Sequence, residues 1–264
     1  MSALEIKSKE IIMDKQPFAR GGFGKVYKAT WSENAVVIKV ISAVSEEEKE
    51  EIIHEAVLTL RLSHPNIIKL FGVTRVKPTK LGIVMEVAEH GSLDKWIGQT
   101  QGDKLLKIAL GIIDGLAYVH LQKVIHRDIK PRNILMFGPS DDMIPKIADF
   151  GVSKLVETAV ATLTRVGEEL YMAPEVRLYG KHSGYPADIY SLAMTLFELF
   201  NEQLIRESSD EIKRFIDGVR CGRMESIPRS CKVPECLRSI IERGLDEVPE
   251  KRPSLSEYRP IIRG

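Results

Sequence analysis

The stretch VIHRDIKPRNIL, residues Val124–Leu135, sets charged and amide side chains between two apolar runs. Asp128 could accept or orient a hydroxyl proton, and Lys130 could stabilise charge that develops on a transferred phosphoryl group. Asn133, in the same loop, could add a metal ligand. The alternative is an ordinary charged turn, so the prediction of a catalytic loop depends on partner residues elsewhere in the chain.

A second acidic position occurs in KIADFG, where Asp149 ends an apolar strand and precedes Gly151, which allows a sharp bend. Carboxylate oxygens suit Mg²⁺, and that ion in turn bridges phosphate oxygens. The sequence YMAPE then closes a polar segment that contains four hydroxyl side chains: Ser153, Thr158, Thr162 and Thr164.

A glycine cluster lies near the N-terminus, in ARGGFGKVY. Gly21, Gly22 and Gly24 between two strands would let the backbone bend tightly and present N–H groups to a phosphate. A hairpin turn that merely tolerates glycine is the alternative. A P-loop is disfavoured because that motif starts with glycine where Ala19 stands, and needs Ser or Thr where Val26 follows the lysine.

Lys39 lies inside the apolar run AVVIKVI, and a lysine in a buried strand is costly unless an anion meets it. Glu55 shares a helix face with Ile52 and other apolar residues, so this carboxylate also needs a partner. We therefore predict a Lys39–Glu55 pair. The alternative is an outward-facing lysine on an edge strand.

The elements that must position these residues change in kind along the chain. Strands are predicted in the first third: one on each side of the glycine cluster, one through Lys39, and two more around 67–74 and 81–87. Ser45 and Glu48 fit a capping box before the helix that carries Glu55. Beyond a changeover near 86–91 the pattern is mostly helical, with a cap expected at Asp103 and a helix through ADIYSLAMTLFELF that is apolar nearly all round.

Composition narrows the class of protein. The chain has 264 residues, of which 44% are hydrophobic, and 38 basic against 37 acidic residues leave a net charge of +1. That balance argues against wholesale binding to nucleic acid or to an anionic membrane. The first thirty residues lack the apolar core of a signal peptide, no apolar stretch is long enough to span a bilayer, and the three cysteines form no CxxC pair. A soluble, cytoplasmic protein without direct membrane insertion is expected.

These motifs occur in one order: RGGFGKV, VVIK, Glu55, HRDIKPRN, DFG, APE, Asp188 in ADIYS and Arg252 in EKRPS. The sequence resembles a eukaryotic-type protein kinase domain of the Ser/Thr type over essentially its whole length. The resemblance implies an α+β, two-lobed protein kinase fold, with a small antiparallel β-sheet N-lobe that has one major helix and a larger, mainly α-helical C-lobe. Residues 1–264 would form a single kinase domain (1–86 N-lobe; 87–264 hinge and C-lobe). Whether the chain is complete or is a domain cut from a longer protein stays open, and its start and end close to the kinase boundaries favour a cut domain.

The resemblance also assigns roles for ATP and Mg²⁺. Asp128 would orient the substrate hydroxyl, Lys130 would contact the γ-phosphate, and Lys39 would hold the α and β phosphates and pair with Glu55. Asn133 and Asp149 would bind the metal. Met85 would be the gatekeeper, and the wider set expected to line the nucleotide site is Ala19, Gly21, Gly22, Gly24, Val26, Val37, Lys39, Met85, Glu86, Val87, Ser92 and Leu135. Glu175 would pair with Arg252 as a structural clamp, and Asp188 would brace the catalytic loop.

The lysine two residues after Asp128 is typical of Ser/Thr kinases, and the overall texture is most similar to the tyrosine-kinase-like group, which contains receptor-interacting and mixed-lineage kinases. Four positions depart from the family pattern: Ala19, Val37, Thr59 and Glu168. Glu168 stands where related kinases have threonine. It could sequester Lys130 or repel Asp128, it could favour substrates with a basic residue near the acceptor, or the loop could fold differently.

Arg127, directly before Asp128, could receive a phosphate carried by the activation segment, with Lys154 assisting. Thr162 and Thr164 are the leading phosphosites, followed by Thr158 and Ser153; a loop that is never modified is the alternative. Expected partners are protein substrates and an upstream kinase or dimer partner. Two other functions stay open: a pseudokinase acting as a nucleotide-binding signalling scaffold, and a small-molecule phosphotransferase, which usually lacks APE and its paired arginine.

Overall fold

The structure is a computed structural model and describes residues 5–21, 24–43, 45–150, 168–180, 184–207, 210–222 and 226–258. The described chain divides into two compact units. The first runs to Glu89 and also takes in Asp149 and Phe150; the second holds His90–Ala148 and the described residues from Glu168 onward. The division predicted from the sequence, 1–86 and 87–264, stays a prediction.

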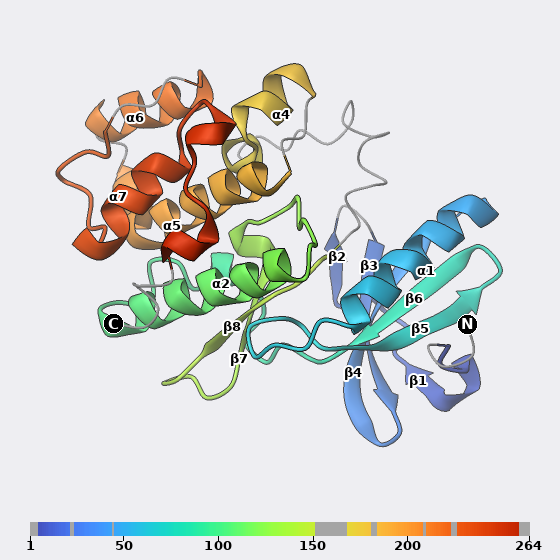
Figure 1. The fold of residues 1–264 in the computed structure, drawn as a ribbon. Helices are drawn as coiled ribbons and strands as arrows, with labels where there is room; N and C mark the ends of the chain where they lie inside the picture. Colours follow the sequence, from blue (N-terminus) through green and yellow to red (C-terminus); the bar gives the residue numbers. More distant parts are fainter. Residues whose placement is uncertain are drawn as a thin grey trace. The chain divides into compact units, whose positions relative to one another are not determined.

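The first unit is an antiparallel sheet with one long helix (Figure 1). Its elements are η1 (Ser8–Glu10), β1 (Ile11–Met13), β2 (Ala19–Gly21), β3 (Gly24–Trp31), β4 (Asn34–Ser42), α1 (Glu46–Leu60), β5 (Leu70–Lys77) and β6 (Lys80–Met85). The strand order is β1-β3-β4-β6-β5, and β2 also pairs with β3. A curled antiparallel sheet with one long helix in the first unit and a mainly helical second unit make up the two-lobed kinase fold expected from the sequence.

Strand β4 is buried on both faces. Because the side chains of a strand alternate between its two faces, they pack into two different apolar clusters. Val36, Ile38 and Val40 pack into one apolar cluster with Val84, whereas Ile41 joins a second cluster with residues of α1. The helix begins as predicted: Ser45 Oγ accepts the N–H of Glu48 at 3.1 Å and Glu48 Oε2 accepts the N–H of Ser45 at 3.4 Å. The capping box is confirmed.

Two predictions about strands need correction. The stretch before the glycine cluster forms two short strands, β1 and β2, because Pro17 lies between them and cannot donate to a strand ladder. The next pair lies at Leu70–Lys77 and Lys80–Met85, so Ile67 and Ile68 precede their strand, where each is 2% exposed. The apolar residues Ile67 and Ile68 therefore indicate burial correctly, but they do not belong to the strand.

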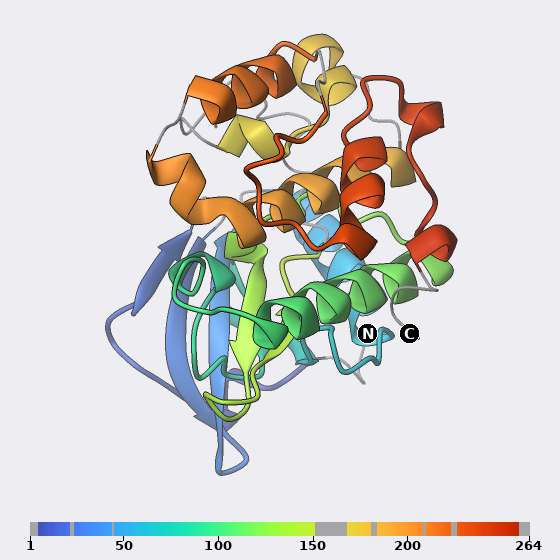
Figure 2. The same cartoon turned by 90° about the vertical axis from the view of Figure 1, so that its left-hand side faces the viewer.

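The second unit is mainly helical. Its elements are η2 (Leu93–Lys95), α2 (Asp103–Leu121), η3 (Pro131–Asn133), β7 (Ile134–Phe137), β8 (Ile144–Ile147), η4 (Glu168–Tyr171), α4 (Pro174–Tyr179), α5 (Tyr185–Glu207), α6 (Asp210–Arg220), α7 (Glu235–Gly244) and η5 (Pro249–Lys251). Helix α5 packs against α2 and α7, and α2 lies along the β7–β8 hairpin (Figure 2). The predicted all-apolar character of α5 is confirmed, since Ala187–Phe197 are buried throughout.

One helix end differs from its prediction. Gly102, with φ of 66°, precedes α2, and Asp103 is its first helical residue and makes no side-chain cap bond. The cap predicted at Asp103 is therefore wrong. Glycine takes this position because its backbone reaches positive φ without a Cβ penalty.

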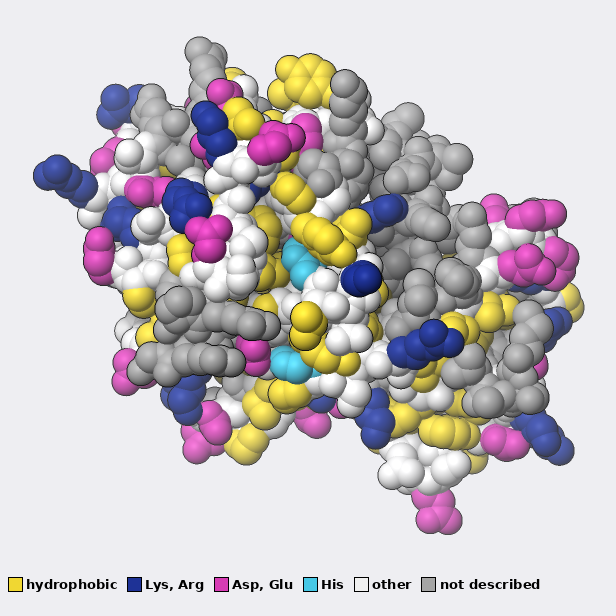
Figure 3. Space-filling view, viewed as in Figure 1, with side chains coloured by type: hydrophobic (Ala, Val, Ile, Leu, Met, Phe, Trp, Pro, Cys, Tyr) yellow, Lys and Arg dark blue, Asp and Glu magenta, His cyan; other side chains and the backbone are white. Residues whose placement is uncertain are grey.

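Acidic side chains gather over the N-terminal end of α1 (Figure 3), where Glu46, Glu47 and Glu50 are exposed. Negative charge at that end stabilises a helix through its dipole, so the cluster is accounted for by the helix itself. Among the described residues, no helix is both long enough and apolar enough to cross a membrane.

Candidate active site

Lys39 is 6% exposed and lies in β4 between β3 and β6, so it is not on an edge strand. The alternative of an outward-facing lysine is therefore wrong. Its ammonium group forms an ion pair with Asp149, with Nζ 2.5 Å from Oδ1. The side chain of Glu55 lies outside the described residues, so the Lys39–Glu55 pair stays a prediction.

Asp149 has a backbone φ of 65°, which is uncommon for a non-glycine residue. A position of this kind costs about 1–3 kcal/mol and persists only where the surrounding structure holds it. The next residue, Phe150, is 8% exposed. The turn therefore points the carboxylate of Asp149 toward Lys39 while the neighbouring ring enters an apolar pocket.

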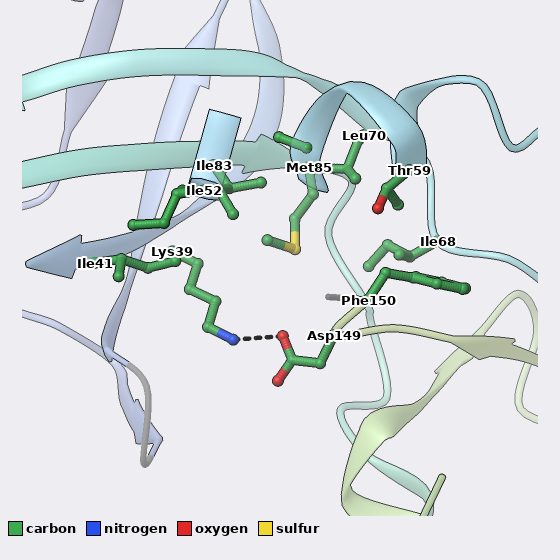
Figure 4. Close-up of a pocket in the computed structure, with 11 residues that line it drawn as sticks. Lys39, Ile41, Ile52, Thr59, Ile68, Leu70, Ile83, Met85, Asp149 and Phe150 are labelled. Atoms are coloured by element: carbon green, nitrogen blue, oxygen red, sulfur yellow. Dashed lines mark hydrogen bonds and ion pairs between the residues drawn. The ribbon is translucent and has the colours of Figure 1, made fainter. Parts of the chain in front are cut away.

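That pocket lies behind the Lys39–Asp149 pair (Figure 4). Its lining residues are Lys39, Ile41, Ile52, Ala56, Thr59, Ile68, Leu70, Ile83, Met85, Asp149 and Phe150. The volume open to the centres of water-sized molecules is about 30 Å³, so the pocket has room for water. Thr59 puts a hydroxyl in this largely apolar wall. Met85, the predicted gatekeeper, lines the same pocket, and its role beside a nucleotide stays a prediction.

Gly21 ends β2 and Gly24 begins β3, where Ala19 pairs with Val26 and Gly21 with Gly24. A Cβ on Gly24 would collide with the carbonyl oxygen of Val40, so the close approach of β3 to β4 needs a glycine there. Gly22 lies outside the described residues. The expected adenine contacts Val26 and Val37 lie in adjacent strands, and Val37 is opposite Met85.

The hinge residue Glu86 is tied to the preceding loop. Its N–H donates to the carbonyl of Lys69 at 3.1 Å, and its carboxylate Oε1 accepts the N–H of Lys69 at 2.8 Å. The backbone N–H of Glu86 therefore already donates a hydrogen bond within the protein. Val87 follows it as a half-buried residue. In the second unit, the other expected nucleotide contacts Ser92 and Leu135 are joined by an isolated antiparallel bridge.

The three polar residues of the catalytic loop are brought together in the second unit. The amide nitrogen of Asn133 donates to the carboxylate Oδ2 of Asp128 and to its backbone carbonyl, both at 2.7 Å. The ammonium group of Lys130 lies 2.9 Å from Oδ1 of the same carboxylate. Asp128 is thus held in one orientation by two neighbours, which is what a group that must meet a substrate hydroxyl requires.

The backbone before Asp128 is held by Asp188, which is fully buried. Its carboxylate accepts the N–H of His126 at 2.8 Å and of Arg127 at 2.7 Å. Burial alone would raise the pKa of Asp188, but the hydrogen bonds from His120 and the His126 amide hold it below its usual value. The carboxylate therefore stays charged and anchors Arg127, whose φ of 70° is otherwise unfavourable.

His126 is fixed in one tautomer. Its Nε2 lies 2.9 Å from the carbonyl of Ala148, which only accepts, so this nitrogen carries the hydrogen. Its Nδ1 accepts the N–H of Asp128 at 3.3 Å. The ring therefore links the catalytic loop to the strand that leads to Asp149.

One contact was missed by sequence reasoning. His120, at the C-terminal end of α2, places its Nε2 2.9 Å from Oδ2 of Asp188. A histidine six residues before HRD was the available signal, but spacing alone does not distinguish it from any other partly buried histidine. The predicted clamp between Glu175 and Arg252 is confirmed, with two parallel bonds of 2.7 Å.

The predicted regulatory positions lie outside the described residues. These are Ser153, Lys154, Thr158, Thr162 and Thr164. Glu168 begins η4, but the structure does not describe its side chain. The interpretations of Glu168 and of the four hydroxyl residues therefore stay predictions.

The residues fit the chemistry of a hard divalent cation bound with phosphate. Asn133 uses its amide nitrogen for both bonds to Asp128, which leaves the amide oxygen as an acceptor. Asp149 bonds Lys39 through Oδ1, which leaves Oδ2. Oxygen donors of this kind suit Mg²⁺, which keeps few protein ligands and shares substrate phosphates. Lys39 would supply positive charge to such phosphates.

Comparison with known proteins gives a consistent result. The family model of the protein kinase domain matches residues 13–259. The chain is 33% identical to the dual specificity protein kinase shkE of Dictyostelium discoideum over 96% of its own length and 36% of that protein. It is 30% identical to the serine/threonine-protein kinase STY46 of Arabidopsis thaliana, over 90% of the chain and 41% of that protein. It is 29% identical to the serine/threonine/tyrosine-protein kinase HT1 of the same plant, over 93% and 64%.

The chain thus spans less than two thirds of the length of each of these relatives. The match of the family model covers nearly all of the described residues, including both halves of the site. By sequence, fold and the residues gathered in each unit, the chain belongs to the protein kinase domain family.

Proposed function

We propose that the chain is an ATP- and Mg²⁺-dependent serine/threonine protein kinase. The observation that carries this proposal is the catalytic loop, in which Asp128 is oriented by Asn133 and Lys130 and its backbone is anchored by buried Asp188. A loop without chemistry has no need of a strained backbone tied to a buried carboxylate. The serine/threonine names of several relatives and the position of Lys130 support the choice of acceptor.

In the proposed reaction a serine or threonine oxygen forms a bond to the γ-phosphorus of ATP, and the bond from that phosphorus to the β–γ bridging oxygen breaks. Asp128 orients the hydroxyl and takes its proton, and ADP leaves with the bridging oxygen. Lys130 stabilises charge on the transferred group, and Lys39 positions the α and β phosphates. Mg²⁺, held by Asn133 and Asp149, would neutralise phosphate charge.

The finer parts of the proposal concern kinship and control. Kinship with the tyrosine-kinase-like group is supported by the sequence texture around HPNIIKLFGV and YPADIYSLAMTLFEL. Residues 1–264 would act as one kinase domain. Phosphorylation of Thr162 or Thr164, by an upstream kinase or a dimer partner, would give Arg127 an anion to bind.

The test is intact-mass measurement of the purified chain incubated with ATP and Mg²⁺, beside Asp149→Asn. Mass gains in steps of one phosphate are expected in the wild type and not in the variant. A generic protein substrate is included, because some kinases do not phosphorylate themselves. Omission of Mg²⁺ should stop the reaction.

Magnesium-dependent nucleotide binding without phosphorylation of the chain or of any substrate would overturn the proposal. It would favour instead a pseudokinase that acts as a nucleotide-binding scaffold. Thr59 in the pocket wall and the bulk of Val37 are the features that such a result would bring forward. A Glu168→Thr variant would then test whether that one residue blocks turnover.

A further inference from the structure

The starting observation is the set of donors to Asp188. Its carboxylate has no exposure to solvent and accepts three N–H groups. Two are backbone amides of the catalytic loop, His126 at 2.8 Å and Arg127 at 2.7 Å. The third is the imidazole Nε2–H of His120 at 2.9 Å. Because a carboxylate oxygen only accepts, Nε2 of His120 must carry a hydrogen.

His120 is itself held in place. It lies in the last turn of α2, its side chain is 12% exposed, and its ring packs on that of Tyr185 with centroids 4.6 Å apart. Tyr185 and Asp188 both belong to the first turn of α5. The imidazole therefore joins the end of one helix to the beginning of another at the point from which Asp188 reaches the loop.

The contacts form a continuous path to the reacting group. His120 bonds Asp188, Asp188 bonds the amides of His126 and Arg127, and the next residue is Asp128. His120 and the His126 amide share the same oxygen, Oδ2, so loss of the imidazole would free that end of the carboxylate to rotate. Such a rotation would lengthen the hydrogen bonds from the backbone amides of His126 and Arg127 to Asp188, and it would move Asp128.

We propose that His120 is a positioning residue of the catalytic loop, which acts through Asp188 and touches neither ATP nor the protein substrate. The proposal rests on the kinase function proposed above. It predicts a loss in kcat with little change in KM, because the binding groups for ATP and substrate are elsewhere. Displacement of a catalytic group by a fraction of an ångström is enough to slow the chemistry.

Two substitutions separate the hydrogen bond from the packing. His120→Phe keeps a ring against Tyr185 and loses the donor. His120→Gln keeps an N–H donor the same number of bonds from Cβ as Nε2. Leu121→Ala, at an exposed neighbour on the same helix turn, controls for disturbance of the helix end. Thermal melting of all three variants identifies any that fail to fold.

With ATP, Mg²⁺ and a peptide substrate, His120→Phe should lower kcat by about tenfold, the usual weight of a hydrogen bond to a charged group, with both KM values within about twofold. His120→Gln and Leu121→Ala should each stay within about threefold of the wild-type kcat. Wild-type kcat in His120→Phe would overturn the proposal. So would an equal loss in Gln and Phe, because the donor would then not matter.

A second readout does not depend on turnover. Amide hydrogen exchange at His126 and Arg127 should be about tenfold faster in His120→Phe than in the wild type, and unchanged in Leu121→Ala. Unchanged exchange in His120→Phe would sink the positioning role. Faster exchange in a chain whose wild type shows no kinase activity would instead leave the positioning role standing and reject the proposed function.

Discussion

Two ion pairs, one in each unit, are built differently. Arg252 meets Glu175 through two parallel bonds of 2.7 Å, and two further N–H groups, on Nε and Nη1, bind the carbonyls of Asp246 and Pro186. The two side chains are 0% and 12% exposed. Lys39 meets Asp149 through one atom pair at 2.5 Å, and the carboxylate is 34% exposed.

The difference teaches what each pair is for. A buried arginine–carboxylate fork cannot exchange its partners without a large cost, so it holds structure. The side chain of Asp149 is partly exposed, so its carboxylate is open to a further partner such as a metal ion. The family resemblance implied the Glu175–Arg252 pair, whereas Lys39 was expected to pair with Glu55, so only the three-dimensional environment brings Lys39 to Asp149 and separates the two roles.

The largest effect is expected from Arg252→Met. Loss of the guanidinium leaves Glu175 buried without its partner, which should lower the free energy of unfolding by about 3–5 kcal/mol. Urea denaturation measures the change. The double variant Glu175→Gln/Arg252→Met should recover part of the loss, and a single variant within about 1 kcal/mol of the wild type would show that the clamp is not structural.

Lys39→Met should have the opposite effect to Arg252→Met, with a large loss of activity and little change in stability. The variant should lose about 100-fold to 1,000-fold in kcat, because a cation aimed at the phosphates is removed from the site. Its free energy of unfolding should change by less than about 1 kcal/mol, since water can replace Lys39 at the accessible side of Asp149. A loss of stability as large as that of Arg252→Met would contradict the distinction between the two pairs.

Tyr190→Phe sharpens the comparison beside the clamp. The Tyr190 ring lies under the guanidinium of Arg252, 5.2 Å from its carbon, and its buried hydroxyl has no hydrogen-bond partner within the described part of the chain. Burial raises the pKa of Tyr190 to about 12, so the hydroxyl stays neutral. Removing it should be neutral or should stabilise the protein by up to about 1 kcal/mol. A clear loss in urea denaturation would mean that a water molecule satisfies this hydroxyl.

The smallest effect is expected at Cys231. Its thiol is buried but stays neutral, so it avoids the cost of a buried charge without an ion-pair partner. Burial raises the pKa of the Cys231 thiol to about 11. Its contribution to stability is therefore present below the ordinary thiol pKa and lost as pH rises through about 11. Near pH 8, alkylation followed by mass spectrometry should label exposed Cys221 and Cys236 well before Cys231. Equal labelling of the three would contradict this burial.

The sequence predicted the fold class and most of the site because those features leave local marks. Ser45 and Glu48 mark a helix start, and the apolar run around Lys39 marks a buried strand. The HRD, DFG and APE motifs keep their order along the chain. Two predictions from the sequence failed. Gly102, and not Asp103, takes the position before α2, and the buried apolar residues before β5 belong to a loop although their pattern resembles a strand.

The sequence by itself determined which groups must be compensated: a lysine in a buried strand, an aspartate in an apolar helix, an arginine near the end of the chain. The family resemblance named Glu175 as the partner of Arg252, but tertiary structure alone decided that Lys39 meets Asp149 and that Asp188 meets His120, because these partners are distant in sequence and burial depends on every element packed around them. Lys39 lies against Asp149, Arg252 against Glu175, and His120 against Asp188. No periodicity or motif encodes the last of these contacts, since it depends on how the end of α2 meets the beginning of α5.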